Sequence, residues 1–246
     1  ERFGAKNPRS WMLRFHTQTA GVTLTAQQPD NNVIRTTVQA LSAILGGTQS
    51  LHVNSRDEAL SLPTEESVQI SLRTQQILAH ESGVTETVDP LAGSYYVENL
   101  TDRLEAAAFE YIDEIDRMGG AVSALESGYQ TREIHESAFK HQREVESEDR
   151  VVVGVNKYRT DEPPIGKLQT IDPKETAKQV ERVKRVRSER DSSVTQAALD
   201  RLKTIASGSD NTVPSILECV EAYATVGEIA DVFRGIFGEQ QDASGM

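Results

Sequence analysis

Two segments between residues 11 and 54 decide the fold: WMLRFHTQ (residues 11–18) and GGTQSLHVN (residues 46–54). Each is an apolar run that ends in polar side chains. Between them, residues 31–45 carry apolar side chains at a spacing that fits one face of a helix, and Gly46 is placed to end that helix. This order predicts a strand, a crossover helix and a second strand, which makes the two strands parallel neighbours.

Polar side chains gather at the predicted carboxyl ends of these strands. Parallel α/β folds bind ligands at that rim, so His16, Gln18 and Asn54 are expected to emerge there together. Side chains alternate along a strand. His16 and Gln18 therefore share one side of the first strand, and His52 and Asn54 share one side of the second.

The remainder of the chain is predicted to be mainly helical. Thr64 is placed to cap one helix, and Asp172 and Pro173 are placed to start another. A short third strand is expected near Thr87 and Val88, and the β-rich run VVVGVNKY predicts a strand at residues 151–158. Helical spacing recurs over residues 101–119, 121–126, 131–146 and 216–237, with a linker over 161–168 and a frayed tail over 239–246.

These elements assign the chain to the α/β class, with strand–helix units that can supply part of a (β/α)8 TIM-type barrel. Residues 1–100 are expected to hold these strand–helix units, and residues 101–246 a mostly helical extension with one short strand near 151–158. A complete barrel needs eight such units in about 250 residues. A partner or a missing segment must therefore cover the open strands, and the start at Glu1 instead of Met leads us to expect something upstream.

Composition excludes several classes of function. The chain has 246 residues, of which 37% are hydrophobic, enough for one large domain or two modest ones. Its net charge of -12 disfavours binding to nucleic acids and to anionic membranes. The single Cys219, with no signal peptide and no apolar run near the ~18 residues of a membrane span, predicts a cytoplasmic protein.

Several kinds of chemistry compete for the rim. His16 and His52, with Asp57 or Glu58 as a third ligand, are candidate metal ligands, but no short ligand spacing supports them and no metal is predicted. The sequence has no nucleophile elbow and no phosphate-binding glycine loop. The remaining rim groups are amides, hydroxyls and Glu58. Such groups suit a site that positions a large polar cofactor, which then performs the difficult chemistry.

Six motifs, in order across nearly the whole chain, resemble the acyl-CoA mutase family, above all the large (catalytic) subunit of methylmalonyl-CoA mutases. The resemblance implies an adenosylcobalamin enzyme, in which a barrel holds an acyl-CoA substrate along its axis and cobalamin lies on the C-terminal rim. It implies a radical isomerisation between (R)-methylmalonyl-CoA and succinyl-CoA, in an oligomer. The motifs are HTQTAG (16–21), LTAQQPDNN (24–32), GGTQSLHVN (46–54), DEALSLPT (57–64), DPLAGSYY (89–96) and VGVNKY (153–158).

The resemblance also assigns site residues. Gln18, Asn54 and Glu58 match the family's contacts around the adenosyl group and the cobalamin face, and His16 and Gln49 match rim positions. All five are predicted to bind the cofactor, and no catalytic residue is assigned. An amide and a carboxylate can hold ribose hydroxyls. Alternatively, His16, Gln49 and also His52 only satisfy backbone groups at strand ends.

The chain departs from the family pattern at two places. The cobalamin-binding domain, with its Asp-x-His-x-x-Gly motif, is absent, although VGEI (226–229) and VF (232–233) resemble the segment before it. A cobalamin-binding small subunit or domain is therefore an expected partner. The first barrel strands, which carry most CoA contacts in the family, are absent too. The resemblance therefore implies the C-terminal part of a (β/α)8 TIM-type barrel, with its last strand–helix units in residues 1–100, followed by a largely helical extension. Related mutases acting on 2-hydroxyisobutyryl-, isobutyryl- or ethylmalonyl-CoA stay open, as does a non-catalytic, partner-binding subunit.

Overall fold

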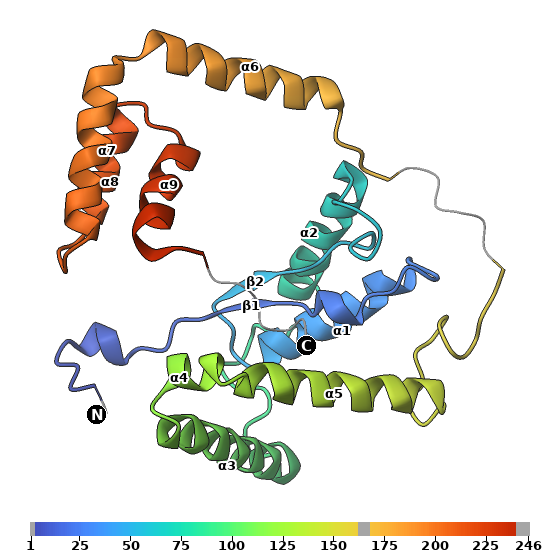
Figure 1. Cartoon of the computed structure of the whole chain (residues 1–246). Coiled ribbons are helices and arrows are strands. Elements are labelled where there is room, and N and C mark those ends of the chain that lie inside the picture. Colours follow the sequence, from blue (N-terminus) through green and yellow to red (C-terminus); the bar gives the residue numbers. More distant parts are fainter. Residues whose placement is uncertain (1–2, 162–167, 240–246) are drawn as a thin grey trace. The chain divides into compact units, whose positions relative to one another are not determined.

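The computed structural model describes residues 3–161 and 168–239, which form two compact units, residues 1–170 and 171–246 (Figure 1). The linker expected over residues 161–168 and the tail expected over 239–246 lie mostly outside the described residues. Unit 1 contains η1 (Pro8–Trp11), β1 (His16–Gln18), η2 (Gly21–Thr23), α1 (Asn31–Leu45), β2 (Ser50–His52), α2 (Glu65–His80), α3 (Tyr95–Arg117), α4 (Ala121–Glu126) and α5 (Tyr129–Glu146). Unit 2 contains α6 (Pro173–Glu189), α7 (Ser192–Ala206), α8 (Val213–Glu221) and α9 (Val226–Phe237).

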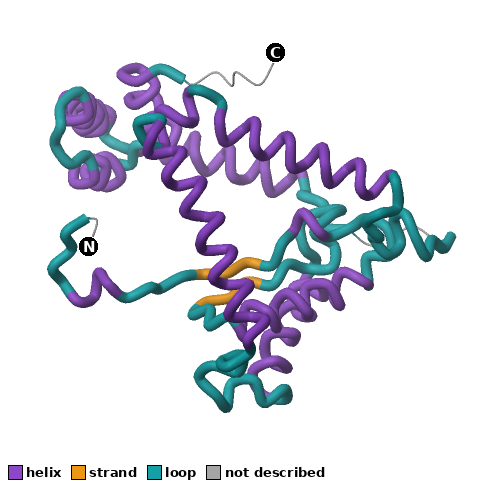
Figure 2. The backbone as a smooth tube through the Cα atoms, turned by 90° about the horizontal axis from the view of Figure 1, so that it is seen from below, coloured by secondary structure: helices purple, strands orange, loops and turns teal. Residues whose placement is uncertain are grey.

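The predicted strand, crossover helix and strand are confirmed. β1 and β2 are parallel, with His16 opposite Ser50 and Gln18 opposite His52, and α1 connects them. Figure 2 shows the two strands side by side. The helix spans the predicted residues, and its C-cap is Gly46. The next residue, Gly47, takes the positive φ of 80° that turns the chain toward β2, a conformation that favours glycine.

The core of unit 1 lies between the two-stranded sheet and two helices. Ala40, Val53 and Leu78 are buried together, with Leu41, Ile44 and Leu51 packed against them. Leu51 and Val53 therefore turn one face of β2 toward α1 and α2, which also pack on each other. Each buried side chain of this kind stabilises the fold by roughly 1.5–3 kcal/mol. The opposite face of the sheet has no such cover among the described residues.

The helix starts follow the capping signals of the sequence. The Thr64 side chain accepts the N–H of Ser67 at the start of α2, as predicted. Asp172 caps α6 through the N–H of Lys174, ahead of Pro173. α3 begins earlier than expected, because the hydroxyl of Ser94 accepts the N–H of Val97 and starts the helix at Tyr95.

The strand expected at residues 151–158 is not formed. The segment is a tight turn closed by a single bridge between Val153 and Lys157. Gly154 has a φ of 83°, and the Asn156 side chain accepts the N–H of Val152, so the chain folds back on itself and cannot stay extended. The third strand expected near Val88 is likewise absent, and that side chain is fully exposed in a series of turns and bends.

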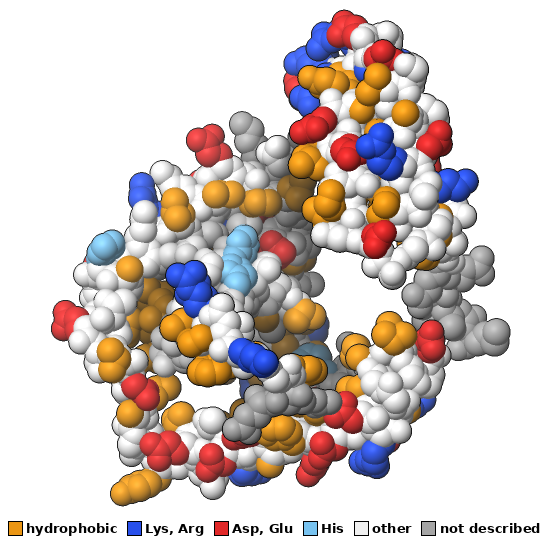
Figure 3. All heavy atoms as spheres, turned by 90° about the vertical axis from the view of Figure 1, so that its left-hand side faces the viewer, with side chains coloured by type: hydrophobic (Ala, Val, Ile, Leu, Met, Phe, Trp, Pro, Cys, Tyr) orange, Lys and Arg blue, Asp and Glu red, His pale blue; other side chains and the backbone are white. Residues whose placement is uncertain are grey.

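Residues 3–161 and 168–239 are thus mostly helical with one small parallel sheet, and no closed barrel is present among them. By contacts, α3–α5 belong with the strands in unit 1. The division expected at residue 100 stays a prediction. Many large apolar side chains are exposed, including Leu104, Phe109 and Phe139, and Figure 3 shows hydrophobic side chains across much of one face. None of the described helices is long and apolar enough to cross a bilayer.

Unit 2 is a small helical assembly. α7 packs against α8 and α9 around Leu202 and Cys219, both fully buried. Burial raises the pKa of the Cys219 thiol, which fits the predicted spectator role. Partly buried Ile229, Val232 and Phe233 complete this core from α9.

Candidate functional site

The uncovered face of the sheet is polar. His16 and Gln18 on β1, and Ser50 and His52 on β2, are exposed, while Thr17 and Leu51 between them are partly buried. Alternation along each strand explains this pattern, because the core takes every second side chain. The face of the sheet opposite to α1 and α2 therefore presents imidazole, amide and hydroxyl groups.

Three of the predicted residues meet at the carboxyl end of the strands. Gln18 Nε2 donates a long hydrogen bond of 3.5 Å to Asn54 Oδ1. A Cβ atom built on Gly21 would lie 3.2 Å from Asn54 Nδ2 and 3.4 Å from Glu58 Oε1, so both side chains border the same glycine. We call Gln18, Asn54 and Glu58 the rim residues, and residues 19–30 the rim loop.

Asn54 is the fixed member of this group. It is 2% exposed, and Thr19 Oγ1 donates to its Oδ1 at 2.7 Å while its own N–H donates back to Thr19 Oγ1 at 2.9 Å. Ser71 Oγ on α2 donates to its carbonyl at 3.2 Å. Glu58, by contrast, is exposed, and none of the described residues forms a hydrogen bond or ion pair with its carboxylate. The site thus combines a held amide with a free carboxylate.

Asp57 stabilises the segment between Asn54 and α2 through hydrogen bonds. Its carboxylate accepts the Ser55 hydroxyl at 2.7 Å and the Thr64 N–H at 3.1 Å. Burial by itself would raise the pKa of Asp57, but the hydrogen bonds from Ser55, Thr64 and Ser67 outweigh it and hold the pKa below its ordinary value. Because these bonds occupy the carboxylate, Asp57 is no free metal ligand. Within the described ranges, no group of three or more His, Cys, Asp or Glu side chains is arranged to hold a metal ion.

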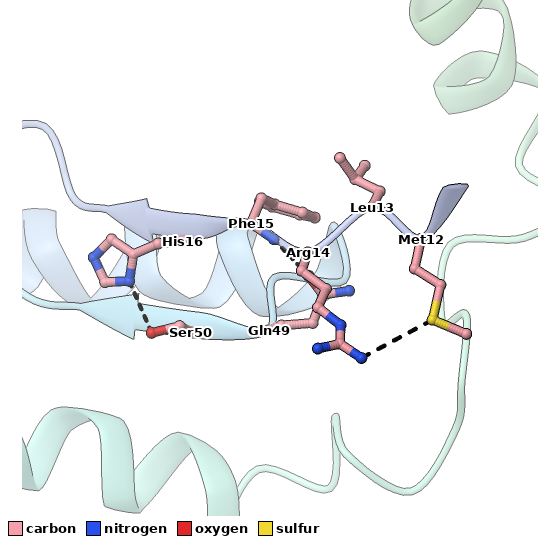
Figure 4. A pocket seen from close by; sticks show the side chains of 7 residues that line it. All are labelled: Met12, Leu13, Arg14, Phe15, His16, Gln49 and Ser50. Carbon is pink, nitrogen blue, oxygen red and sulfur yellow. Dashed lines mark hydrogen bonds between the residues drawn. The ribbon is translucent and has the colours of Figure 1, made fainter. Parts of the chain in front are cut away.

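His16 and Gln49 lie at the other end of the sheet. His16 Nδ1 and Ser50 Oγ share a hydrogen bond of 2.8 Å, and Gln49 Oε1 accepts the N–H of Phe15 at 2.8 Å (Figure 4). Both border an open pocket that Met12, Leu13 and Arg14 also line. The expectation that His16 emerges beside Gln18 and Asn54 is wrong, because His16 opens β1 and Gln18 closes it.

Sequence reasoning missed two residues that shape the rim. Gly21 leaves room for the Asn54 and Glu58 side chains. Asn32 is fully buried at the start of α1, where its Nδ2 donates to the carbonyls of Thr25 and Arg56, both at 2.9 Å. The burial of Asn32 could have been predicted from its spacing with Thr36 and Ala40, which places small and polar residues on the buried face of α1.

Comparisons with known proteins show the family to which the chain belongs. The family model described as methylmalonyl-CoA mutase matches residues 1–239. The chain is 44% identical over 244 residues to the large subunit of 2-hydroxyisobutanoyl-CoA mutase of Aquincola tertiaricarbonis, covering 98% of this chain and 43% of that protein. It is 47% identical over 241 residues to the methylmalonyl-CoA mutase of Rhizobium meliloti (strain 1021), covering 97% and 34%.

A third relative is the methylmalonyl-CoA mutase large subunit of Propionibacterium freudenreichii subsp. shermanii, 42% identical over 244 residues, which cover 96% of this chain and 34% of that protein. The chain therefore spans less than half the length of these relatives. The family model nonetheless matches nearly all of it, and the chain belongs to the methylmalonyl-CoA mutase family.

Proposed function

We propose that this chain forms part of a larger or multi-chain adenosylcobalamin-dependent mutase that interconverts (R)-methylmalonyl-CoA and succinyl-CoA. Membership of the family and the names of the relatives support an acyl-CoA mutase. The observation that carries the cofactor assignment is that Asn54 and Glu58 border Gly21 together and that Gln18 donates a hydrogen bond to Asn54. When bound, adenosylcobalamin would supply the radical chemistry that the side chains of this chain lack.

The chemistry of the rim residues fits such a cofactor. A nucleoside group presents hydroxyls that need acceptors and ring atoms that need donors. Glu58 offers an acceptor that no described residue occupies, and the Asn54 amide nitrogen faces the same space over Gly21. Thr19 and Ser71 hold Asn54 in place before any ligand arrives, which lowers the entropic cost of binding. The rim therefore suits orientation of the adenosyl group.

The roles predicted for His16 and Gln49 rest on the resemblance alone. Both are already bonded inside the chain, to Ser50 and to the backbone of Phe15. This geometry equally fits the alternative in which they satisfy strand-end groups. We keep both as predicted cofactor-binding residues.

Partners are part of the proposal. Two relatives are named large subunits, and this chain covers 43% and 34% of their lengths. We propose a cobalamin-binding small subunit or domain as the partner that brings the corrin to the rim. The polar sheet face with His16, Gln18 and His52 then faces a closed, water-poor space, which protects reactive species.

Glu58→Gln in the complete enzyme tests the cofactor assignment. If Glu58 accepts ribose hydroxyls, loss of its charge should raise the Kd for adenosylcobalamin about tenfold, which corresponds to roughly 1.4 kcal/mol. Absorbance titration measures this Kd. Hydroxocobalamin, which has no adenosyl group, is the matched control, and its affinity should not change. Equal affinity of wild type and variant for adenosylcobalamin would remove Glu58 from the site.

A related substrate is the second candidate. The 2-hydroxyisobutanoyl-CoA mutase large subunit aligns over more of its own length than the methylmalonyl-CoA mutases do, at similar identity. Parallel assays of the complete enzyme with methylmalonyl-CoA and with 2-hydroxyisobutyryl-CoA decide between them by kcat/KM. Turnover of neither ester, with no cobalamin binding, would favour the non-catalytic, partner-binding subunit.

A further inference from the structure

A rigid turn late in unit 1 reaches back to the rim loop. We call residues 151–160 the clip. Asn156 fixes its shape, because its Oδ1 accepts the N–H of Val152 at 2.7 Å. Its Nδ2 donates to the carbonyls of Val145 at 2.8 Å and Arg150 at 2.7 Å, which ties the clip to the end of α5. One amide side chain thus satisfies three backbone groups and leaves the clip little freedom.

Gln28 is the first contact between the clip and the rim loop. Its Nε2 donates to the carbonyl of Tyr158 and to Thr160 Oγ1, both at 2.9 Å. Gly154 is buried directly against it: a Cβ at this position would lie 2.9 Å from Gln28 Cδ and 3.0 Å from its Oε1. Gly154 also has a φ of 83°. The positive φ favours glycine here, and a Cβ would displace the Gln28 amide from its present place.

Arg35 is the second contact. From the first turns of α1, its Nη2 donates to the carbonyl of Val153 at 2.7 Å. Its Nη1 donates to Asn32 Oδ1 at 2.8 Å and to Thr25 Oγ1 at 3.0 Å. The planar guanidinium has donors in a fixed fork, so it can hold the clip, the helix start and the rim loop in one geometry.

Asn32 connects Arg35 to the segment that holds the rim residues Asn54 and Glu58. Its Nδ2 donates to the carbonyl of Arg56, which lies between Asn54 and Glu58 in the chain. The rim loop reaches the same residues a second time at Gly21, which both side chains border. Residues more than a hundred positions apart in the sequence are thereby joined through short hydrogen bonds, from Val153 through Arg35 and Asn32 to the rim.

We propose that the clip positions the rim: Gly154, Gln28 and Arg35 set the rim loop against α1 and thereby set the distance between Asn54 and Glu58. None of these three residues is one of the rim residues. The identity of the ligand that the rim binds depends on the proposed function. The positioning of the rim residues by the clip does not, because it involves only residues of this chain. A purely local role would stabilise residues 151–160 and leave the rim unaffected.

Gly154→Ala in the full chain is the test, with Gly83→Ala as its control. Both glycines have positive φ, 83° and 72°, so both variants carry the same kind of backbone strain, but a Cβ on Gly83 meets nothing within 4 Å. Amide hydrogen exchange reports on the rim loop and the rim residues through Leu24, Thr25 and Glu58, whose N–H groups donate to Gly21, Asn32 and Ser55 respectively. Exchange there should be about tenfold faster in Gly154→Ala and unchanged in Gly83→Ala.

A milder variant guards against misfolding. Gln28→Asn suits the positive φ of 47° at this position and is too short to reach Tyr158 and Thr160. Like Gly154→Ala, it should make hydrogen exchange at the Glu58 N–H faster than in the wild type. If both variants change exchange only within residues 151–160, the clip is a local structure and the positioning role is wrong.

Cofactor affinity separates this inference from the proposed function. In the complete enzyme, Gln28→Asn should raise the Kd for adenosylcobalamin about threefold to tenfold, and Arg35→Lys, which keeps the charge and loses the fork, should do the same. If the wild type does not bind adenosylcobalamin, the proposed function is wrong, and hydrogen exchange alone decides the positioning role. If the wild type binds and neither variant changes the Kd, positioning is overturned.

Discussion

Gly21 is the residue on which the spacing of the rim residues depends most directly. No positive φ is required there, so alanine fits its backbone, but the new Cβ would lie 3.2 Å from Asn54 Nδ2 and 3.4 Å from Glu58 Oε1. Because Thr19 holds Asn54, the exposed Glu58 side chain is the group that must move.

Gly21→Ala should therefore change the free energy of unfolding by less than about 1 kcal/mol. It should raise the Kd for adenosylcobalamin about fivefold. Urea unfolding of the chain and cofactor titration of the complete enzyme measure the two effects. Gly235→Ala in α9 is the control, since its Cβ meets nothing within 4 Å and alanine favours a helix. Unaltered cofactor affinity in Gly21→Ala would contradict the geometry of the rim.

At the scale of single residues, the sequence predicted that Gln18 and Asn54 lie close together, but it did not predict the residues whose hydrogen bonds hold the rim in place. Gln18 and Asn54 meet because alternation and parallel pairing follow directly from the pattern of apolar residues. The roles of Asn32 and Asp57 could not be predicted, because their hydrogen bonds to Arg56 and Thr64 depend on how the loops fold back. His16 was misplaced because the pattern fixes which side of a strand a residue faces, but not where the strand begins.

At the scale of the helices, one carboxylate of unit 2 joins the end of α6 to the start of α9. Glu228 accepts Arg190 Nη2 at 2.6 Å and Nη1 at 2.7 Å, Arg187 Nη2 at 2.9 Å, and the N–H of Thr225 at 2.8 Å, which completes the capping box of α9. The hydrogen bonds from Arg190 and then Thr225 outweigh the effect of burial and hold the pKa of Glu228 far below its usual range.

A carboxylate whose pKa is depressed in the folded state stabilises above its unfolded pKa, about 4.3, and this contribution is lost as pH falls through the folded pKa. Glu228→Gln should lower the unfolding free energy of unit 2 by about 2 kcal/mol at pH 7, with a smaller difference near pH 3. Hydrogen exchange of α9 measures it. Glu218→Gln, which loses only an exposed pair with Arg201, should cost less than about 0.5 kcal/mol. A difference that does not change with pH would contradict this account.

Helices were predictable because caps and periodicity are local signals: α1 has the predicted bounds, and Thr64 and Asp172 start α2 and α6 as expected. The outcome at residues 151–158 could not be predicted in this way, because a segment with high strand propensity forms a strand only when another strand lies beside it and pairs with it. Among the described residues no strand pairs with Val151–Val153 beyond one bridge, and Gly154 and Asn156 close a turn instead.

At the scale of the whole molecule, the sheet is the informative feature. β1 and β2 pair only with each other among the described residues, and one sheet face buries Leu51 and Val53 while the other exposes His16 and His52. A two-stranded sheet of this kind is stable here because α1 and α2 cover one face. The barrel itself could not be derived from this chain, because closure requires strands that the described residues do not contain.

The chain by itself should therefore show no mutase turnover, even with adenosylcobalamin and a cobalamin-binding partner. In the proposed function the three rim residues orient a nucleoside group, but a half-covered sheet cannot exclude water from the face that carries His16 and His52. Turnover assays of the chain alone, of the chain with its partner, and of a protein with the full length of the longer relatives measure this. Circular dichroism must show that the inactive chain is helical, so that misfolding is not the cause. Turnover by the folded chain alone would contradict the proposal that the active site is shared with other segments.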